Sequence, residues 1–166
     1  MGESLSRPPK AAHHFRRVAI LFAGGPAPGA NAVISTAATS FMREGTEVLG
    51  MKHGYSSLAD YSPAKPLAEG RDYIKITPDF LKRTRNGQGI MIGTARTNPG
   101  KHVSSPAHLE DPTRVQPLKN AYEGLRSLGV EALISIGGDD TLKTANKFKL
   151  YQDRLPADCP RIPGRS

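Results

Sequence analysis

The sequence has one cysteine, no tryptophan and no apolar run of membrane-spanning length. A lone cysteine, Cys159, cannot form an internal disulfide, which excludes a disulfide scaffold and fits a reducing cytosol. The longest apolar run, at 18–23, has the length of a strand, whereas a membrane helix needs about 20 such residues. No apolar stretch of signal-peptide type precedes it. These absences predict a cytoplasmic protein that does not bind a membrane.

Aromatic residues are scarce, at 6%, while the net charge is +8 at pH 7. A basic chain can bind nucleic acid. Here, however, the charge is spread along the chain, and no basic stripe with interleaved aromatic residues is present. Several basic residues lie near the ends, at Arg7, Lys10, Arg16, Arg17, Arg154, Arg161 and Arg165. We therefore expect small phosphorylated partners and no nucleic acid.

The hydrophobic pattern alternates between strand-like and helix-like segments. A short aliphatic run flanked by charge and glycine predicts a buried parallel strand, and apolar residues at helical spacing predict a helix. The predicted strands are 17–22, 47–51, 89–93 and 131–136, and the predicted helices are 30–44, 114–128 and 141–151, with a short helical turn at 56–61 and a loop at 97–112. This order predicts an α/β protein with a Rossmann-like, open, mostly parallel sheet and helices on both faces, in three layers.

The 166 residues are enough for one compact domain. We expect a flexible polar leader at 1–15, because this segment is polar and contains a Pro-Pro step. An α/β domain follows at 16–155, and a tail at 156–166.

A Gly-Gly-x-x-Pro-Gly-x-Asn-Ala turn at 24–32 lies between the first predicted strand and the first predicted helix. Backbone N–H groups at a helix N-terminus have no partner, and the helix dipole there favours an anion. Glycines such as Gly24 and Gly25 let the backbone approach a phosphate closely. The alternative is a plain strand–helix turn. The spacing fits neither a Walker loop nor a dinucleotide fingerprint.

A second turn, Gly-Gly-Asp-Asp-Thr at 137–141, also lies between a predicted strand and a predicted helix. One carboxylate at a helix start is explained by capping, but two that follow a glycine pair are explained less well. Carboxylates beside a phosphate-binding turn can hold Mg²⁺, which shares hard oxygen ligands with phosphate. We therefore expect Mg²⁺ as the cofactor.

These turns, together with Gly-Tyr-Ser-Ser-Leu at 54–58 and Gly-Thr-Ala-Arg at 93–96, resemble the phosphofructokinase family in order and approximate spacing over residues 17–150. The Gly-Gly-Asp-x-Thr element alone is shared with other kinases, but the combination is specific. The resemblance implies phosphoryl transfer to the 1-hydroxyl of fructose 6-phosphate, a step of glycolysis. It also implies a homo-oligomer for the full-length protein.

The resemblance also implies a role for individual residues. Arg96 is similar to the arginine that stabilises charge on the transferred phosphoryl group, with Thr97 beside it. Asp139 is similar to the aspartate linked to Mg²⁺. The expected donor-phosphate site comprises Gly24, Gly25, Arg96, Thr97, Gly138, Asp139, Asp140 and Thr141. Tyr55 matches a position near the adenine site of ATP users, but a packed tyrosine is the better interpretation.

Asp140 indicates pyrophosphate as the donor. In ATP-dependent members the corresponding residue is usually glycine, which leaves room for the α-phosphate. A carboxylate there occupies that space and repels an incoming phosphate, whereas pyrophosphate ends one phosphate earlier. We therefore count Asp140 with Arg96 among the catalytic residues. Two alternatives are an ATP-dependent 6-phosphofructokinase and an inactive phosphate-binding or regulatory module.

The sequence departs from the family near its end. The family's general base lies in a Thr-Ile-Asp-Asn-Asp segment, and the expected position after 159–163 does not match it. The second domain, which in the family supplies most sugar-phosphate contacts, is not seen. We therefore expect a fragment or a truncated reading frame, with a divergent tail, that is inactive alone.

Overall fold

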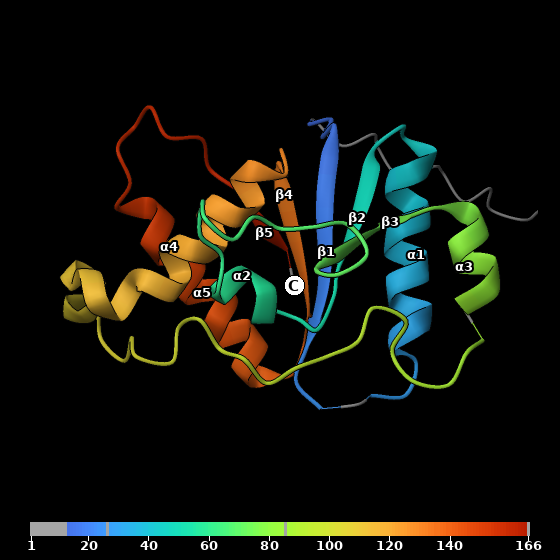
Figure 1. Ribbon diagram of the computed structural model, residues 1–166, viewed down its shortest axis with the longest axis horizontal. Coiled ribbons are helices and arrows are strands. Elements are labelled where there is room, and N and C mark those ends of the chain that lie inside the picture. The colour runs from blue at the N-terminus through green and yellow to red at the C-terminus, as the bar shows by residue number, and fades with distance from the viewer. Residues whose placement is uncertain (1–12, 26, 85, 166) are drawn as a thin grey trace, which may run out of the picture.

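Five strands form one sheet in the computed structural model, which describes residues 13–25, 27–84 and 86–165 (Figure 1). The strands are β1 (Arg17–Ala23), β2 (Glu47–Met51), β3 (Tyr73–Ile76), β4 (Ala132–Gly137) and β5 (Gly164–Arg165). Their order in the sheet is β3-β2-β1-β4-β5. All neighbouring strands run parallel except β2 and β3, which pair antiparallel.

The central strand β1 is apolar on both faces because both faces are covered. Its residues from Val18 to Phe22 are at most 2% exposed. Ile20 pairs with Gly50 of β2 on one side and with Ile134 of β4 on the other. The two neighbours of β1 therefore fix its position in the middle of the sheet.

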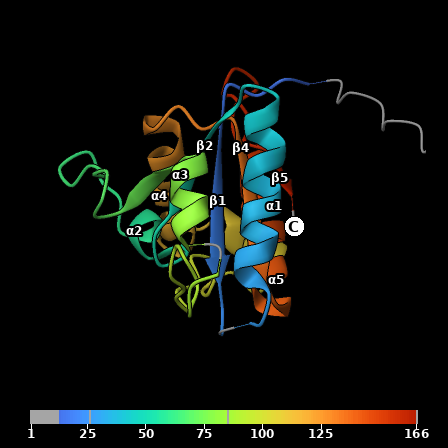
Figure 2. The same ribbon diagram turned by 90° about the vertical axis from the view of Figure 1, so that its right-hand side faces the viewer.

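Helices cover both faces of the sheet, which confirms the predicted three-layer α/β architecture (Figures 1 and 2). One face packs against α1 (Ala30–Arg43) and α3 (Pro78–Thr84), which face the viewer in Figure 2. The other face packs against α2 (Ser56–Ala59), α4 (Pro112–Ser127) and α5 (Asp139–Asp153). A 3₁₀ helix, η1 (Pro106–Glu110), lies in the segment predicted as a loop. None of the helices in the described ranges is long and apolar enough to cross a membrane.

The predicted strand at 89–93 is wrong. This segment forms no strand, although Ile92 is buried at 1% exposure and its carbonyl accepts a hydrogen bond from His53 N–H (3.0 Å). The reason is that β2 already pairs with β1 and β3, so neither of its edges is free. Ile92 instead packs over the face of β2 at Gly50, where an added Cβ would lie 2.7 Å from its side chain.

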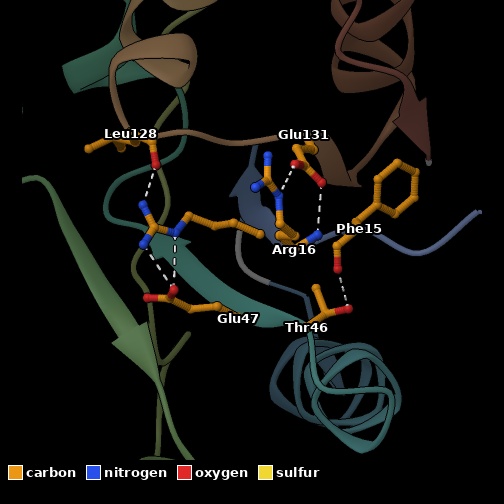
Figure 3. Close-up of polar contacts among 7 residues, drawn as sticks. Phe15, Arg16, Thr46, Glu47, Leu128 and Glu131 are labelled. Atoms are coloured by element: carbon orange, nitrogen blue, oxygen red, sulfur yellow. Dashed lines mark hydrogen bonds and ion pairs between the residues drawn. The ribbon is translucent and has the colours of Figure 1, made fainter.

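Charged side chains join the N-terminal ends of the strands. Arg17 donates to the Glu47 carboxylate from two nitrogens (2.9 and 3.2 Å) and to the Leu128 carbonyl (Figure 3). Arg16 pairs with Glu131 at 3.1 Å, and its backbone N–H donates to the same carboxylate. The Arg17 guanidinium lowers the pKa of Glu47. These contacts align the starts of the parallel strands β1, β2 and β4. The carboxyl ends of these strands therefore lie together at the other end of the sheet.

The segment predicted as a tail contributes to the sheet and core. Ile162 is 1% exposed, and its backbone N–H and carbonyl both bond to the Gln152 side chain (2.6 and 3.0 Å). Strand β5 then pairs with β4 through Gly164 and Leu133. The division into leader, domain and tail stays a prediction, and residues 1–12 of the predicted leader lie outside the described residues.

Candidate functional site

A cavity opens where the carboxyl ends of β1 and β4 meet. The helix that follows β1 packs on one face of the sheet, and the helix that follows β4 packs on the other. Two adjacent strands whose connections diverge in this way leave a crevice, which is the usual ligand site of an open α/β sheet. The volume of the cavity, about 560 Å³, is typical of small-molecule sites.

Every residue that the sequence predicted for the donor-phosphate site lines this one cavity. These residues are Gly24, Gly25, Arg96, Thr97, Gly138, Asp139, Asp140 and Thr141. They come from the ends of two strands, the first turn of α5 and the loop after Gly93, which runs across the lower end of the sheet in Figure 1. The structure thus brings both glycine turns and the arginine together. Their roles in binding stay a prediction.

The first turn holds the loop that carries Arg96. Gly24 has a φ of 108°, a conformation that side-chain-bearing residues rarely adopt. Its N–H donates to the Ala95 carbonyl (3.1 Å), and Thr94 Oγ1 donates to the Gly24 carbonyl (2.7 Å). These two bonds place Arg96 directly beside the turn. Pro26, in the same turn, lies outside the described residues.

The second turn packs tightly against β1. An added Cβ at Gly137 would lie 2.2 Å from the Ala23 carbonyl oxygen and 2.3 Å from Thr141 Oγ1. Thr141 Oγ1 itself donates to the Ala23 carbonyl (3.1 Å). Helix α5 begins at Asp139 after Gly138, which has no side chain with which to cap it. The first backbone N–H groups of α5 are therefore available to an anion in the cavity.

The charged side chains of the cavity are exposed to it. Arg96, Asp139 and Asp140 form no side-chain hydrogen bond or ion pair with any other described residue. Within the described part of the chain, no three metal-ligating side chains cluster together. One or both of these carboxylates would hold a Mg²⁺ ion, which prefers hard oxygen ligands and shares them with phosphate.

Tyr55 forms a neutral part of the cavity wall. It is 1% exposed, and its hydroxyl lies 2.9 Å from Ser135 Oγ. Burial raises the pKa of Tyr55 to about 12, so the phenol stays protonated at neutral pH. The interpretation of Tyr55 as a packed tyrosine is therefore correct.

Three further polar residues, Asn98, Lys143 and Thr144, line the cavity and were not predicted from the sequence. Lys143 and Thr144 lie one helical turn beyond Asp139 and Asp140. The i, i+4 spacing from the two aspartates is a signal that could have identified both. Asn98 could have been found only from the loop geometry.

Comparison with known proteins identifies the family of the chain. The sequence profile of the family described as Phosphofructokinase matches residues 17–164. The pyrophosphate–fructose 6-phosphate 1-phosphotransferase of Thermotoga maritima is 32% identical over 79% of this chain and 27% of that protein. The ATP-dependent 6-phosphofructokinase of Aquifex aeolicus is 36% identical over 78% of this chain and 33% of that protein.

Solved structures share the fold. The phosphofructokinase of Pichia pastoris has a TM-score of 0.63 at 20% identity, over 95% of this chain and 16% of that one. The pyrophosphate-dependent phosphofructokinase of Marinobacter aquaeolei has a TM-score of 0.60 at 16% identity, over 90% of this chain and 33% of that one. The chain thus spans about a third or less of the length of each of these four relatives. On the match across 17–164, the chain belongs to the phosphofructokinase family.

Proposed function

We propose that this chain binds the phosphoryl donor in a cytoplasmic phosphofructokinase, and that the donor is pyrophosphate. The observation that carries the proposal is the single cavity lined by both glycine turns, Arg96 and the aspartate pair. In the complete reaction the phosphoryl group passes to the 1-hydroxyl of fructose 6-phosphate.

The backbone of both turns supplies the anion site. Gly24 and Gly25 follow β1, and the first N–H groups of α5 lie in the adjacent turn. An added Cβ at Gly25 or Gly138 would meet nothing within 4 Å, so phosphate oxygens can approach the backbone there. Arg96, held beside Gly24 by its loop, neutralises charge that develops on the transferred phosphoryl group.

Asp139 is proposed as the Mg²⁺ ligand. It lines the cavity at the start of α5, and its carboxylate has no partner among the described residues. When bound, Mg²⁺ would neutralise charge on the donor's phosphate oxygens. Thr97 also lines the cavity, and its hydroxyl lies 2.9 Å from Ser56 Oγ, a contact that restrains the side chain.

Asp140 is proposed to select pyrophosphate over ATP. Its carboxylate lines the cavity and would repel a third phosphate group placed beside it. ATP as the donor is the second candidate, because relatives named for ATP are as similar as those named for pyrophosphate.

Equilibrium binding of pyrophosphate and ATP to the wild-type chain and to Asp140→Gly tests the choice of donor. We expect the substitution to allow ATP binding, because it removes the carboxylate that would repel a third phosphate group, and so to lower the preference for pyrophosphate over ATP. Unchanged preference in the variant would refute the role of Asp140.

We further propose that the chain alone binds the donor without turnover. The sequence contains no Thr-Ile-Asp-Asn-Asp segment, which the family resemblance identifies with the general base. Sugar-phosphate contacts and homo-oligomeric assembly would belong to the longer protein. An inactive binding or regulatory module would also bind the donor, so phosphoryl transfer by the longer protein distinguishes the two. Phosphofructokinase activity in the purified 166-residue chain would contradict the proposal.

A further inference from the structure

Lys143 is a cation of the cavity that the family resemblance does not explain. It is exposed, it lies on α5, and it lines the cavity together with Arg96 and the aspartate pair. The charged side chains that line the cavity are thus two cations and two carboxylates. Without Lys143 the carboxylates would outnumber the cations, which is unfavourable for a site that binds a polyanion.

Lys143 does not form the ion pair with Asp139 that its position on α5 would allow. The i, i+4 spacing from Asp139 allows a surface ion pair of the kind that Lys119 and Glu123 form on α4 at 3.9 Å. Lys143 forms no ion pair or side-chain hydrogen bond with any residue in the described ranges. Lys147, one turn further along α5, is different because its ammonium donates to the Gly100 carbonyl (3.0 Å).

The position of Lys143 along α5 indicates which part of a ligand it meets. The helix starts beside the strand ends, next to Gly24 and Gly25, and Lys143 lies about one turn, or roughly 5.4 Å, further along. A phosphate group bound at the glycine turns would therefore leave a second, linked phosphate group on the side of Lys143.

We propose that Lys143 is a specificity-determining residue whose ammonium binds the donor phosphate group farther from Gly25. This inference rests on the proposed function, since it assumes that the cavity binds a diphosphate. It predicts a distinction between ligands. Pyrophosphate, with two linked phosphate groups, uses Lys143, whereas orthophosphate bound at the glycine turns does not.

Calorimetric titration of the chain with pyrophosphate and with orthophosphate, both in the presence of Mg²⁺, tests the inference. We expect Lys143→Met to weaken pyrophosphate binding about tenfold or more and orthophosphate binding about twofold or less, because a charge-assisted contact is lost only with the diphosphate. Lys143→Arg, which keeps the charge, should retain most of the affinity for pyrophosphate.

Lys149→Met is the matched control. Lys149 is exposed on the same helix but does not line the cavity, so this variant changes the net charge equally and should bind pyrophosphate as the wild type does. Equal pyrophosphate affinity in wild type and Lys143→Met would overturn this inference alone, as would an equal loss for both ligands. A wild-type chain that does not bind pyrophosphate would overturn the proposed function and this inference with it.

Discussion

Thr144 Oγ1 lies 2.9 Å from Asn98 Oδ1, and this contact joins helix α5 to the loop that carries Arg96 and Thr97. The same hydroxyl lies 2.8 Å from the Asp140 carbonyl, so its proton has two acceptors. Thr144 is 2% exposed, which shields the contact from water. The aspartate pair and the arginine are thus held at a fixed separation across the cavity.

Removal of the Thr144 hydroxyl should loosen this connection. Thr144→Val keeps the shape but leaves Asn98 Oδ1 with one donor fewer, so we expect a loss of about 1 to 2 kcal/mol in the free energy of unfolding. Pyrophosphate affinity should fall as well, because the arginine loop is no longer fixed. Urea denaturation and calorimetry measure the two effects. Thr36→Val, at an exposed position on α1, is the control, and an equal response in both variants would contradict the prediction.

Gly137 should tolerate no side chain, because the two nearest atoms that its Cβ would meet lie within 2.3 Å and one of them belongs to the backbone of β1. We expect Gly137→Ala to reduce stability by about 3 kcal/mol, as overpacking of a rigid contact does. Gly25→Ala has open space at the same atom and should leave the melting temperature nearly unchanged while weakening pyrophosphate binding. Similar melting temperatures for the two variants would show that the two turns are not packed in this way.

The sequence predicted most of the sheet because its strands carry a strong local signal. The apolar run of β1 and the glycine after α1 mark their elements without help from the rest of the chain. Strand β3 was missed because Tyr73–Ile76 alternates polar and apolar residues over only four positions and depends on its partner β2. The strand predicted at 89–93 is also apolar, but β2, over which it lies, already pairs with β1 and β3. In both cases the pairing partner decides whether the segment forms a strand, and the local sequence does not specify that partner.

The candidate site was predictable for a related reason. Each glycine turn directly follows a buried strand. Because the two strands are parallel neighbours, their carboxyl ends, and so the two turns, lie side by side. Asn98 was not predictable, because its contact with Thr144 joins positions 46 residues apart. Neither residue type indicates phosphate binding by itself.

Asp72 should make stability depend on acid pH. It is 7% exposed and accepts hydrogen bonds from Ser57 Oγ (2.8 Å) and Ala68 N–H (2.9 Å). The Arg71 side chain, which donates to the same carboxylate, is the main cause that lowers the pKa of Asp72 to about 2. Because the pKa is lower in the folded state, the stabilisation is complete above the ordinary value near 4 and is lost as pH falls through about 2.

Asp72→Asn should therefore lower the free energy of unfolding by about 1 to 2 kcal/mol at pH 6, a value that allows for the exposure of its partner Arg71. The difference in the free energy of unfolding between wild type and variant should become smaller as the pH falls from about 4 to 2. Chemical denaturation of both proteins across this pH range measures this difference. Asp158→Asn, at an exposed acid, provides the baseline. A difference that does not change with pH would contradict the assigned ionisation.

The claim that both glycine turns form one anion site is tested most directly by nuclear magnetic resonance. Amide resonances of the labelled chain are followed during titration with pyrophosphate and Mg²⁺. The account predicts that the amides of Gly24, Gly25 and residues 138–141 shift together and saturate with a single dissociation constant. Shifts confined to one turn, or two turns that saturate at different concentrations, would contradict it.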